Sequence, residues 1–503
     1  MNIALLLDLV ADTFGDRIAL TDDQGDLTYD QLRAAARSAA GQLIDGKAGT
    51  LAYADVSSRA VPIALFGAAW AGASYAPLNF RLPPSSLAAQ VDRLERPTTV
   101  ASTDLSGQLG DAPGRTTADW MEGLSPDGGV TEFPPEPDGA AVILFTSGSS
   151  GSPKAALLSH DNLLSYVMET VEFAGADEDE ALMLAAPPFH IAGVAAVLTS
   201  VYSGRRLLPL AAFTPQAWLT RARDGGATHA FLVPTMLARV VQALRADPSL
   251  AVPTLRSISY GGARMAMPVL EEALQLFPGV DFVNAYGLTE TSSTIAVLGP
   301  DEHRQALASD DPEVRRRLGS AGRPLPGVEV GIHDEQGGPT PTGVKGSIRV
   351  RGPQVGGEYL DTESGVDAEG WLSTGDVGYL DDEGYLYVEG RADDVIIKGG
   401  ENLSPSEIED VLLRHPSVSA AAVVGVPHRE WGETVAAAVV IDDVPEGETL
   451  DDLSEWVRSH LGSFKAPTTV VVMDELPSTA TGKVLRRSVR DHLAATAEDP
   501  PTG

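Results

Sequence analysis

The chain of 503 residues contains no cysteine. This absence excludes thiolate nucleophiles, disulfide frameworks and cysteine-ligated zinc, so any thiol chemistry must use a thiol supplied from outside the chain. Long hydrophobic runs are also missing, since no apolar stretch approaches the roughly 18 residues that a membrane span needs. The segment 1–15 carries Asp8 and Asp12 and lacks the basic region of a secretory signal. These features predict a soluble, cytoplasmic protein with no membrane span.

Basic residues are scarce, with 36 Lys and Arg against 70 Asp and Glu, which gives a net charge of −34. A field of this sign repels nucleic-acid backbones and anionic lipid surfaces, so we expect neither as a partner. Only six lysines occur, and three of them, Lys154, Lys398 and Lys483, lie in glycine-containing segments. A purely solvated surface role is the less economical explanation for lysines placed in this way.

Two common ligand-binding patterns are absent as well. No two of the nine histidines lie within four residues of each other, so the usual spacings of a histidine metal site are missing. A metal, if bound, is then Mg²⁺ held by carboxylates. The chain also lacks G-x-G-x-x-G, which argues against a Rossmann dinucleotide site.

What is present predicts an α/β fold with parallel strands. Short apolar runs end abruptly in small residues, and helical patterns such as Pro215–Arg223 and Pro268–Phe277 lie between them, so we expect strand–loop–helix units. In such sheets, ligands bind beyond the carboxyl ends of the strands. The expected strands are Ala140–Phe145, Ala230–Val233, Ser257–Tyr260 and Phe282–Ala285.

The length predicts about three structural units of roughly 150 residues. Residues 101–138 are polar and rich in Gly, Pro and Asp, which predicts a surface excursion. A new pattern begins near Ala392, with a helix at Pro405–Leu413 and a strand at Ala420–Val426. We therefore expect a large N-terminal domain of several subdomains over residues 1–391 and a small, mobile α+β domain over residues 392–503.

The strongest local motif runs from Thr146 to Lys154, where small polar residues follow a buried strand. Small residues allow backbone N–H groups to converge on a phosphate, hydroxyls add donors, and a lysine adds a compact positive charge. The spacing does not fit the P-loop pattern, and a Ser/Gly linker is the alternative interpretation. The candidate phosphate-binding residues are Thr146, Ser147, Gly148, Ser149, Ser150, Gly151 and Lys154.

Weaker motifs occur later in the chain. Tyr286–Thr291 combines a ring that can stack on a base with a hydroxyl for phosphate and a carboxylate for Mg²⁺. Asp376 and Arg391 each lie in a glycine turn, where a carboxylate suits ribose hydroxyls, although each alone is more typical of a plain turn. His190 stands in an apolar stretch, which fits a core histidine and a functional one about equally well.

Taken in order, these segments resemble the adenylate-forming superfamily, which contains acyl-CoA synthetases, the adenylation domains of peptide synthetases and firefly luciferase. The resemblance runs nearly from end to end. It is carried by Leu27–Tyr29, Ala71–Asn79, Thr146–Lys154, Tyr286–Glu290, Ser373–Asp376, Gly390–Asp394 and Pro477–Lys483.

The resemblance implies a two-step reaction. A carboxylate attacks the α-phosphate of MgATP to give acyl-AMP and pyrophosphate, and the thiol of CoA, acting as co-substrate, then displaces AMP. It implies that the Thr146–Gly151 loop with Lys154 holds the β- and γ-phosphates, that Thr289 holds the α-phosphate and that Glu290 holds Mg²⁺. We consider His190 a further candidate catalytic residue.

The same resemblance assigns the rest of the nucleotide site. Gly262, Ala263 and Tyr286 would surround adenine, and Asp376 and Arg391 would bind ribose. Lys483 would bridge the carboxylate and the α-phosphate. The small domain would swing about Asp393 between the two half-reactions and exchange Lys483 for a thiol tunnel bordered by Gly400.

The substrate class is less constrained. Malonyl-CoA synthetases carry Arg where this chain has Ala285, and peptide synthetases carry Asp within a segment that here reads Phe189–Ala192. We therefore expect a fatty or aromatic monocarboxylate, with Arg264 meeting a polar tail or only solvent. The alternatives are an acyl-AMP ligase that loads a carrier protein and a nucleotide-binding homologue without catalysis.

Overall fold

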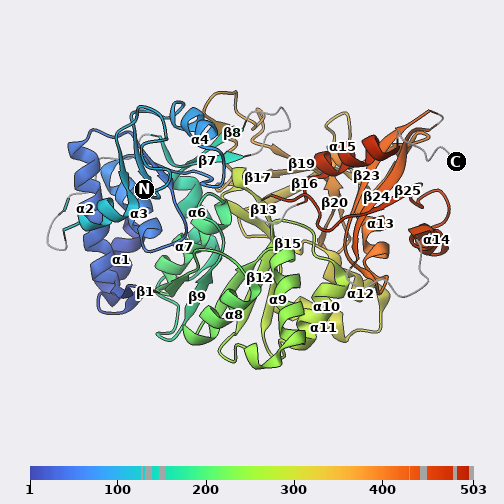
Figure 1. The fold of residues 1–503 in the computed structure, drawn as a ribbon, viewed down its shortest axis with the longest axis horizontal. Coiled ribbons are helices and arrows are strands. Elements are labelled where there is room, and N and C mark those ends of the chain that lie inside the picture. The colour runs from blue at the N-terminus through green and yellow to red at the C-terminus, as the bar shows by residue number, and fades with distance from the viewer. Residues whose placement is uncertain are drawn as a thin grey trace.

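The computed structural model describes residues 1–125, 129–130, 139–146, 153–429, 431–441, 450–479 and 484–497. Within these residues the chain forms four β-sheets, and helices pack on them. Figure 1 shows the segments after residue 395, drawn in orange to red, gathered at one end of the molecule, away from the N-terminus.

The first sheet has seven strands and is parallel through its middle. Near one edge, β8 runs antiparallel to both of its neighbours, β7 and β18. In spatial order the strands are β18 (Glu358–Tyr359), β8 (Lys154–Ser159), β7 (Ala140–Thr146), β4 (Ser74–Pro77), β3 (Thr50–Ala54), β5 (Pro97–Ala101) and β6 (Gly114–Thr116).

The second sheet has nine strands, of which β12, β11, β9 and β10 form a parallel centre. The strand β13 continues this parallel set beside β12, and β14 then returns antiparallel to β13. In spatial order the strands are β15 (Arg323–Pro324), β14 (Ser293–Leu298), β13 (Asp281–Leu288), β12 (Ser257–Gly261), β11 (His229–Leu232), β9 (Ala181–Leu184), β10 (Arg206–Pro209), β1 (Ile18–Asp22) and β2 (Gly25–Thr28).

The other two sheets lie later in the chain. A four-stranded antiparallel sheet contains β16 (Glu329–His333), β17 (Gly346–Arg351), β19 (Leu372–Leu380) and β20 (Leu386–Arg391). A five-stranded sheet contains β22 (Glu401–Leu403), β21 (Ile396–Lys398), β24 (Gly432–Ile441), β23 (Val418–His428) and β25 (Thr469–Val472).

Helices connect and cover these sheets. The α-helices are α1 (Ala4–Phe14), α2 (Tyr29–Asp45), α3 (Ala60–Ala71), α4 (Pro84–Val91), α5 (Thr117–Glu122), α6 (His160–Thr170), α7 (Ile191–Ser203), α8 (Pro215–Asp224), α9 (Pro234–Ala246), α10 (Met267–Leu276), α11 (Pro300–Ala308), α12 (Pro312–Arg315), α13 (Pro405–Leu412), α14 (Leu450–Leu461) and α15 (Arg486–Ala497). Short 3₁₀ helices are η1 (Pro248–Leu250), η2 (Thr289–Thr291), η3 (Arg316–Gly319) and η4 (Ala392–Asp394).

The packing of the helices follows from their sequences. Helix α3 is apolar around its whole circumference and is buried from Ala60 to Trp70, as expected for a helix enclosed on all sides. Helix α2 begins at a capping box formed by Thr28 and Gln31. The two helices approach closely at Gly67, where a Cβ would lie 2.8 Å from the Cβ of Ala39. Only glycine fits this crossing.

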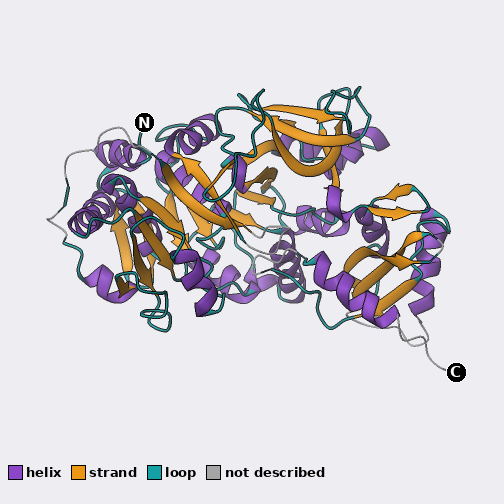
Figure 2. Cartoon of the chain, turned by 90° about the horizontal axis from the view of Figure 1, so that it is seen from above, coloured by secondary structure: helices purple, strands orange, loops and turns teal. Residues whose placement is uncertain are grey.

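The five-stranded sheet is covered on both faces. Side chains alternate along β23, so Val423 packs with α13 and α14, while Ala422 and Val424 pack with Val489 and Leu493 of α15. Figure 2, seen from above, shows this sheet and its helices as a separate group beside the rest of the chain. The group therefore has its own hydrophobic core.

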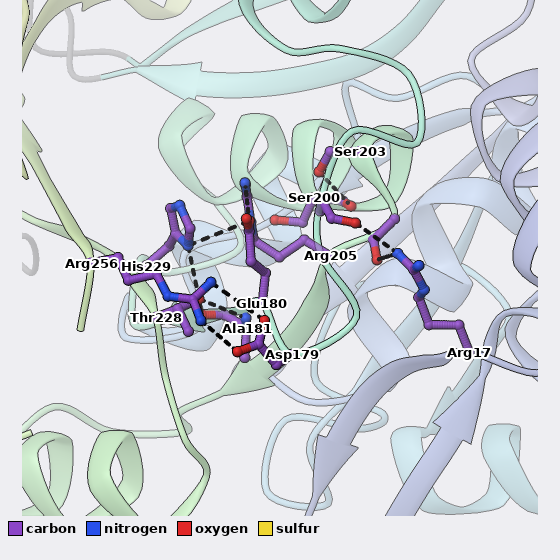
Figure 3. Close-up of polar contacts among 12 residues, drawn as sticks. Arg17, Asp179, Glu180, Ala181, Ser200, Ser203, Arg205, Thr228, His229 and Arg256 are labelled. Atoms are coloured by element: carbon purple, nitrogen blue, oxygen red, sulfur yellow. Dashed lines mark hydrogen bonds and ion pairs between the residues drawn. The ribbon is translucent and has the colours of Figure 1, made fainter. Parts of the chain in front are cut away.

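Polar side chains tie together the amino ends of the central strands in the nine-stranded sheet (Figure 3). Glu180, just before β9, accepts a hydrogen bond of 2.8 Å from Arg205, just before β10. Thr228 precedes β11 and bonds the Nδ1 of His229 at 2.8 Å, while Arg256 precedes β12 and pairs with Asp179 at 2.5 Å. This network occupies the amino ends of the strands. The carboxyl ends, on the opposite side of the sheet, carry different side chains.

Two expectations about local structure are wrong. Ala140–Phe145 does not begin a strand–loop–helix unit, because β7 is followed by the antiparallel β8 before α6 starts. The strand predicted to end at Ala285 continues to Leu288, because β14 pairs with it through Leu288.

Among the described helices, none combines the length and the apolar character that a membrane crossing requires.

Candidate active site

The carboxyl ends of β12 and β13 bring together the three predicted adenine-binding residues. Gly261 lies opposite Ala285, and a Cβ on this glycine would overlap the carbonyl oxygen of Ala285. Gly262 follows with φ = +81°, a conformation that favours glycine, and turns the chain toward Ala263. Tyr286 follows Ala285 on the neighbouring strand. The structure thus places Gly262, Ala263 and Tyr286 at adjacent strand ends.

Tyr286 is tied to the two residues predicted to bind ribose. Its hydroxyl donates a hydrogen bond of 2.6 Å to Oδ2 of Asp376. Arg391 lies opposite Asp376 in the β19–β20 ladder and donates from Nη1 to Oδ1 of Asp376 at 3.5 Å and to the carbonyl of Thr374 at 3.0 Å. These contacts hold a carboxylate, a guanidinium and an aromatic ring in one cluster.

The Asp376 carboxylate is largely buried, with its side chain 11% exposed, whereas that of Arg391 is 44% exposed. Burial and the adjacent charge of Asp376 raise the pKa of Tyr286 well above its ordinary value. The tyrosine hydroxyl therefore keeps its proton at neutral pH and remains a donor to Asp376.

Thr289 and Glu290 follow in η2, three and four residues after Tyr286. Glu290 accepts a hydrogen bond of 2.9 Å on Oε1 from the hydroxyl of Tyr359 in β18. Lys154 begins β8, next to β18, and its Nζ lies 5.1 Å from the centre of the Tyr359 ring. The structure therefore brings Glu290 and Lys154 to the same tyrosine.

The predicted phosphate loop is only partly described. Thr146, the last residue of β7, pairs with Lys154 across the hairpin, and its hydroxyl lies 3.5 Å from the carbonyl oxygen of Lys154. The predicted loop residues Ser147, Gly148, Ser149, Ser150 and Gly151 lie outside the described residues. Lys483 lies outside them as well, so its predicted position beside the α-phosphate stays a prediction.

A metal ion at this site would need ligands from a bound molecule in addition to the described side chains. In the part of the chain that the structure describes, no group of three or more His, Asp and Glu side chains could enclose a metal ion. Glu290 alone offers one carboxylate, and Mg²⁺ is commonly held by one or two carboxylates together with phosphate oxygens and water. The donor set at Glu290 thus fits Mg²⁺ that arrives with a nucleotide.

His190 is placed just before α7, at its N-cap position. Its ring lies 4.8 Å from that of Phe189, centre to centre, and burial together with the charge of Arg81 lowers its pKa to about 4. His190 is therefore neutral at pH 7. Gly193 allows α7 to approach the preceding loop, since a Cβ there would lie 2.5 Å from the carbonyl oxygen of Pro187.

Gly400 lies in the turn between β21 and β22, with φ = +85° and no atom within 4 Å of a Cβ placed on it. Lys398, two residues before Gly400, is 6% exposed, and its Nζ donates a hydrogen bond of 2.7 Å to the carbonyl of Phe464. This lysine, one of the three singled out in the sequence, is therefore engaged within the chain and stabilises the region of the five-stranded sheet.

Arg264 does not meet solvent alone. Its guanidinium pairs at 2.5 Å with Asp410 of α13, so it links the loop after β12 to the helix that covers the five-stranded sheet. Asp410 is 18% exposed, and burial raises the pKa of its carboxyl group. Arg264 thus joins two parts of the molecule that have separate cores.

Sequence reasoning missed Tyr359 and Thr374. Tyr359 contacts both Glu290 and Lys154, and the Thr374 hydroxyl accepts a hydrogen bond of 3.1 Å from the backbone N–H of Asp376. The pattern Ser-Thr-Gly-Asp gave a signal for Thr374, since a threonine two residues before an aspartate often forms such a turn. No local pattern marks Tyr359, because its partners are distant in sequence.

A cavity of about 400 Å³ opens at the amino ends of the strands of the nine-stranded sheet. It is lined by residues that include Arg206, Thr228, Thr254 and Arg256. There, Arg256 is already paired with Asp179. Since parallel sheets bind ligands at their carboxyl ends, the cluster around Tyr286 and Glu290 is the better candidate site.

Comparison with known proteins adds an independent finding. A sequence profile of the AMP-binding enzyme family matches residues 7–360, and a profile of the AMP-binding enzyme C-terminal domain matches residues 407–483. Feruloyl-CoA synthase from an Amycolatopsis species is 34% identical over 485 residues, covering 92% of this chain and 93% of that protein. A 2-succinylbenzoate–CoA ligase from Bacillus licheniformis is 32% identical over 484 residues, covering 94% and 96%.

Solved structures agree with these sequence matches. The o-succinylbenzoate CoA synthetase of Bacillus subtilis, in complex with its acyl-adenylate intermediate, aligns with a TM-score of 0.84 at 28% identity, covering 97% of this chain and 98% of that one. The same protein in complex with ATP and magnesium ion gives a TM-score of 0.82 at 29% identity, covering 97% and 99%.

Proposed function

This chain belongs to the AMP-binding enzyme family, and we propose that it is an AMP-forming acid–thiol ligase: it activates an aromatic carboxylate as acyl-AMP and passes the acyl group to CoA. One observation carries the proposal. The segment from Tyr286 to Glu290 begins at the cluster with Asp376, which suits a ribose, and ends at a carboxylate that contacts the same tyrosine as Lys154. A nucleotide has the same order of groups, from its base and ribose to its charged phosphates.

We assign the ends of the nucleotide accordingly. Gly262, Ala263 and Tyr286 surround adenine, and Asp376 accepts hydrogen bonds from the ribose hydroxyls with Arg391 beside it. Support comes from the close spacing of these residues at neighbouring strand ends. A carboxylate is a suitable partner because it accepts hydrogen bonds and donates none.

The phosphate end follows in the same direction. Thr289 holds the α-phosphate, and Lys154 with the Thr146–Gly151 loop holds the β- and γ-phosphates. Glu290 holds Mg²⁺, which neutralises phosphate charge when it is bound. The contacts of Glu290 with the Tyr359 hydroxyl and of Lys154 with the Tyr359 ring support this part of the assignment.

The first half-reaction brings two anions together. A carboxylate oxygen of the acid attacks the α-phosphorus, the bond to the β-phosphate oxygen breaks, and pyrophosphate leaves. Lys483 is proposed to place its ammonium between the two anions, where the new bond forms. Removing one such preorganised charge typically costs about 3 to 4 kcal/mol of barrier, or about 10² to 10³ in rate.

The second half-reaction transfers the acyl group. The thiolate of CoA attacks the acyl carbonyl, the bond from this carbon to the phosphate oxygen breaks, and AMP leaves with that oxygen. The chain has no cysteine, so the thiol comes from outside. We propose that the boundary at residues 391/392 separates a 1–391 domain from a mobile 392–503 domain, that Asp393 is the hinge and that Gly400 borders the thiol path.

We infer that the acid is an aromatic monocarboxylate. Support for the aromatic ring comes from similar proteins named for ferulate, which has one carboxylate, and 2-succinylbenzoate, which has two. His190, just before α7, is neutral because burial lowers its pKa to about 4, so it supplies no cation for a second carboxylate. The guanidinium of Arg264, the cation nearest Gly262 in sequence, is paired with Asp410, so a second carboxylate on the substrate would have to compete for it.

We place the activity in the cytoplasm, because ATP and CoA are both abundant there. A role in fatty acid metabolism is the less favoured assignment, since the similar proteins named above act on aromatic acids. CoA is the proposed acceptor, and a carrier-protein thiol is an outcome that the experiment below distinguishes.

The test is a panel of carboxylates scored by pyrophosphate release, with and without CoA. Ferulate-like aromatic acids should give release and a CoA thioester, whereas 2-succinylbenzoate and long-chain fatty acids should give less. The variant Lys483→Ala should lose pyrophosphate release by about 10² to 10³ but still form thioester from supplied acyl-AMP. No carboxylate-dependent release from any acid would refute the proposal, and release without a CoA product would redirect the acceptor to another thiol.

A further inference from the structure

Tyr359 lies where the phosphate hairpin meets the predicted metal carboxylate. Its strand β18 pairs antiparallel with β8, so that Tyr359 is opposite Ala156. The next residue, Leu360, donates its backbone N–H to the carbonyl of Ala155 at 2.9 Å. These bonds fix the tyrosine backbone two residues from Lys154 in the ladder.

The chain just before Tyr359 is fixed to η2 as well. The backbone N–H of Gly356 donates to the carbonyl of Glu290 at 2.9 Å. Gln354 is 2% exposed, and its Nε2 donates to the carbonyls of Thr291 at 2.9 Å and Thr294 at 2.7 Å. The segment 354–360 therefore connects the metal carboxylate to the phosphate hairpin through its backbone.

The side chain of Tyr359 makes the same connection. Its hydroxyl donates to Oε1 of Glu290 at 2.9 Å, and the Nζ of Lys154 lies 5.1 Å from the ring centre. A phenol ordinarily carries its proton at neutral pH, so the Tyr359 hydroxyl is the donor in this bond.

A tyrosine in this position restricts two charged groups at once. With Oε1 held by the phenol, the carboxylate of Glu290 has a fixed orientation and its second oxygen has a fixed direction. The ammonium of Lys154 is attracted to the ring face, which limits the directions its long side chain samples. Groups that orient a metal-binding carboxylate commonly change metal affinity by about 10- to 100-fold when removed.

We propose that Tyr359 is a positioning residue that aligns Glu290 for the divalent cation and Lys154 for the terminal phosphates. The inference rests on the proposed function, because it takes the roles of Glu290 and Lys154 from there. It assigns Tyr359 to the adenylation half-reaction alone, since the transfer from acyl-AMP to CoA involves neither the pyrophosphate nor its metal.

The first variant is Tyr359→Phe, which removes the hydroxyl and keeps the ring. Binding of Mn²⁺ in the presence of a non-hydrolysable ATP analogue, followed by electron paramagnetic resonance, should weaken about 10-fold. The Mg²⁺ concentration for half-maximal pyrophosphate release should rise by a similar factor, with the rate largely recovered at saturating Mg²⁺. Thioester formation from supplied acyl-AMP should be unchanged.

A second variant, Tyr359→Leu, removes the ring as well. Because Lys154 then loses the ring face, the KM for ATP should rise beyond its value in Tyr359→Phe, while Mn²⁺ binding should weaken to the same extent as in Tyr359→Phe. The matched control is Tyr202→Phe. Tyr202 lies near the end of α7, outside the proposed site, and the centre of its ring is 5.4 Å from that of Phe173. This control should leave all three measurements at wild-type values.

The outcomes separate this inference from the proposed function. If wild-type protein shows no carboxylate-dependent pyrophosphate release, the proposed function fails, and Mn²⁺ binding still reports on Tyr359. If Tyr359→Phe binds Mn²⁺ within about twofold of wild type, or loses both half-reactions equally, the positioning role is overturned.

Discussion

At the scale of single residues, the site depends on a few charges that other side chains hold in place. The carboxylate of Asp376 receives hydrogen bonds from Tyr286 and Arg391, so it is oriented before any nucleotide binds. Such preorganisation reduces the conformational entropy lost on binding. The same principle places Glu290 against Tyr359.

The variant Asp376→Asn should lower kcat/KM for ATP by about 10- to 100-fold, because hydrogen bonds to a charged group contribute about 1.5 to 3 kcal/mol. Steady-state kinetics with varied ATP would measure the change. Asp382→Asn, in the exposed turn between β19 and β20, is the matched control and should behave as wild type. Equal kinetics for the two variants would mean that Asp376 does not bind the nucleotide.

Buried histidines make stability depend on pH. Burial lowers the pKa values of His160, His190 and His229 to about 4, below the value of about 6.5 expected in the unfolded chain. The unfolded state then binds more protons between these values, so stability is complete above about pH 6.5 and falls as the pH drops toward 4. At pH 5 each histidine should cost about 2 kcal/mol.

His160 offers a direct check of this pH dependence, because its Nδ1 accepts a hydrogen bond of 3.1 Å from the backbone N–H of Ile3. Asparagine at this position can accept the same bond and does not titrate. The urea midpoint of His160→Asn should therefore fall less than that of wild type between pH 7 and pH 5. Identical pH profiles would show that His160 titrates normally in the folded protein.

At the scale of elements, the backbones approach closely at the bulge between β13 and β14. A Cβ on Gly287 would overlap the carbonyl oxygen of Ser293, and the paired strands shift register between Tyr286 and Gly287. This close pairing carries the chain from the Tyr286 cluster into η2. The two halves of the site are therefore connected through one glycine.

Gly287→Ala should push the strands apart, with an overpacking cost of about 1 to 3 kcal/mol, and should displace Thr289 and Glu290. We expect a lower melting temperature and a loss of pyrophosphate release of at least about tenfold. Gly41→Ala is the control, because nothing lies within 4 Å of a Cβ at Gly41 in α2 and alanine favours helices. A variant Gly287→Ala with wild-type stability and activity would contradict the close approach.

The sequence predicts the positions of several strands correctly, but it does not predict strand direction or contacts between distant segments. The strands at Ala230–Val233 and Ser257–Tyr260 are confirmed to within one residue, since buried runs flanked by turn residues have strong local signals. The hairpin β7–β8 was predicted wrongly as a strand–loop–helix unit, because strand direction depends on partners rather than on local pattern. Tyr359 was missed for the same reason, since it meets Glu290 across 69 positions of chain.

At the scale of the whole molecule, Arg264 and Asp410 join the nine-stranded sheet to the C-terminal group of helices and strands. Each of these parts has its own hydrophobic core, so polar contacts of this kind bias their relative orientation. Breaking the ion pair should therefore change orientation more than it changes stability.

Arg264→Gln should broaden the distance distribution between labels on the two parts. The cysteine-free chain permits clean labelling through Ser86→Cys in α4 and Asp491→Cys in α15, both exposed, with distances read by double electron–electron resonance. Arg304→Gln is the control, since Arg304 pairs with Asp281 and Asp301 inside the large part. An unchanged distribution for Arg264→Gln would show that the ion pair does not set the orientation.

The central claim is that a carboxylate oxygen becomes bonded to the α-phosphorus of ATP. The most direct test is to supply an aromatic acid labelled with heavy oxygen in its carboxylate, together with ATP and CoA, and to weigh the products by mass spectrometry. The account predicts one heavy oxygen in AMP and none in pyrophosphate, because AMP leaves with the bridging oxygen. Unlabelled AMP, or a label in inorganic phosphate beside ADP, would contradict it.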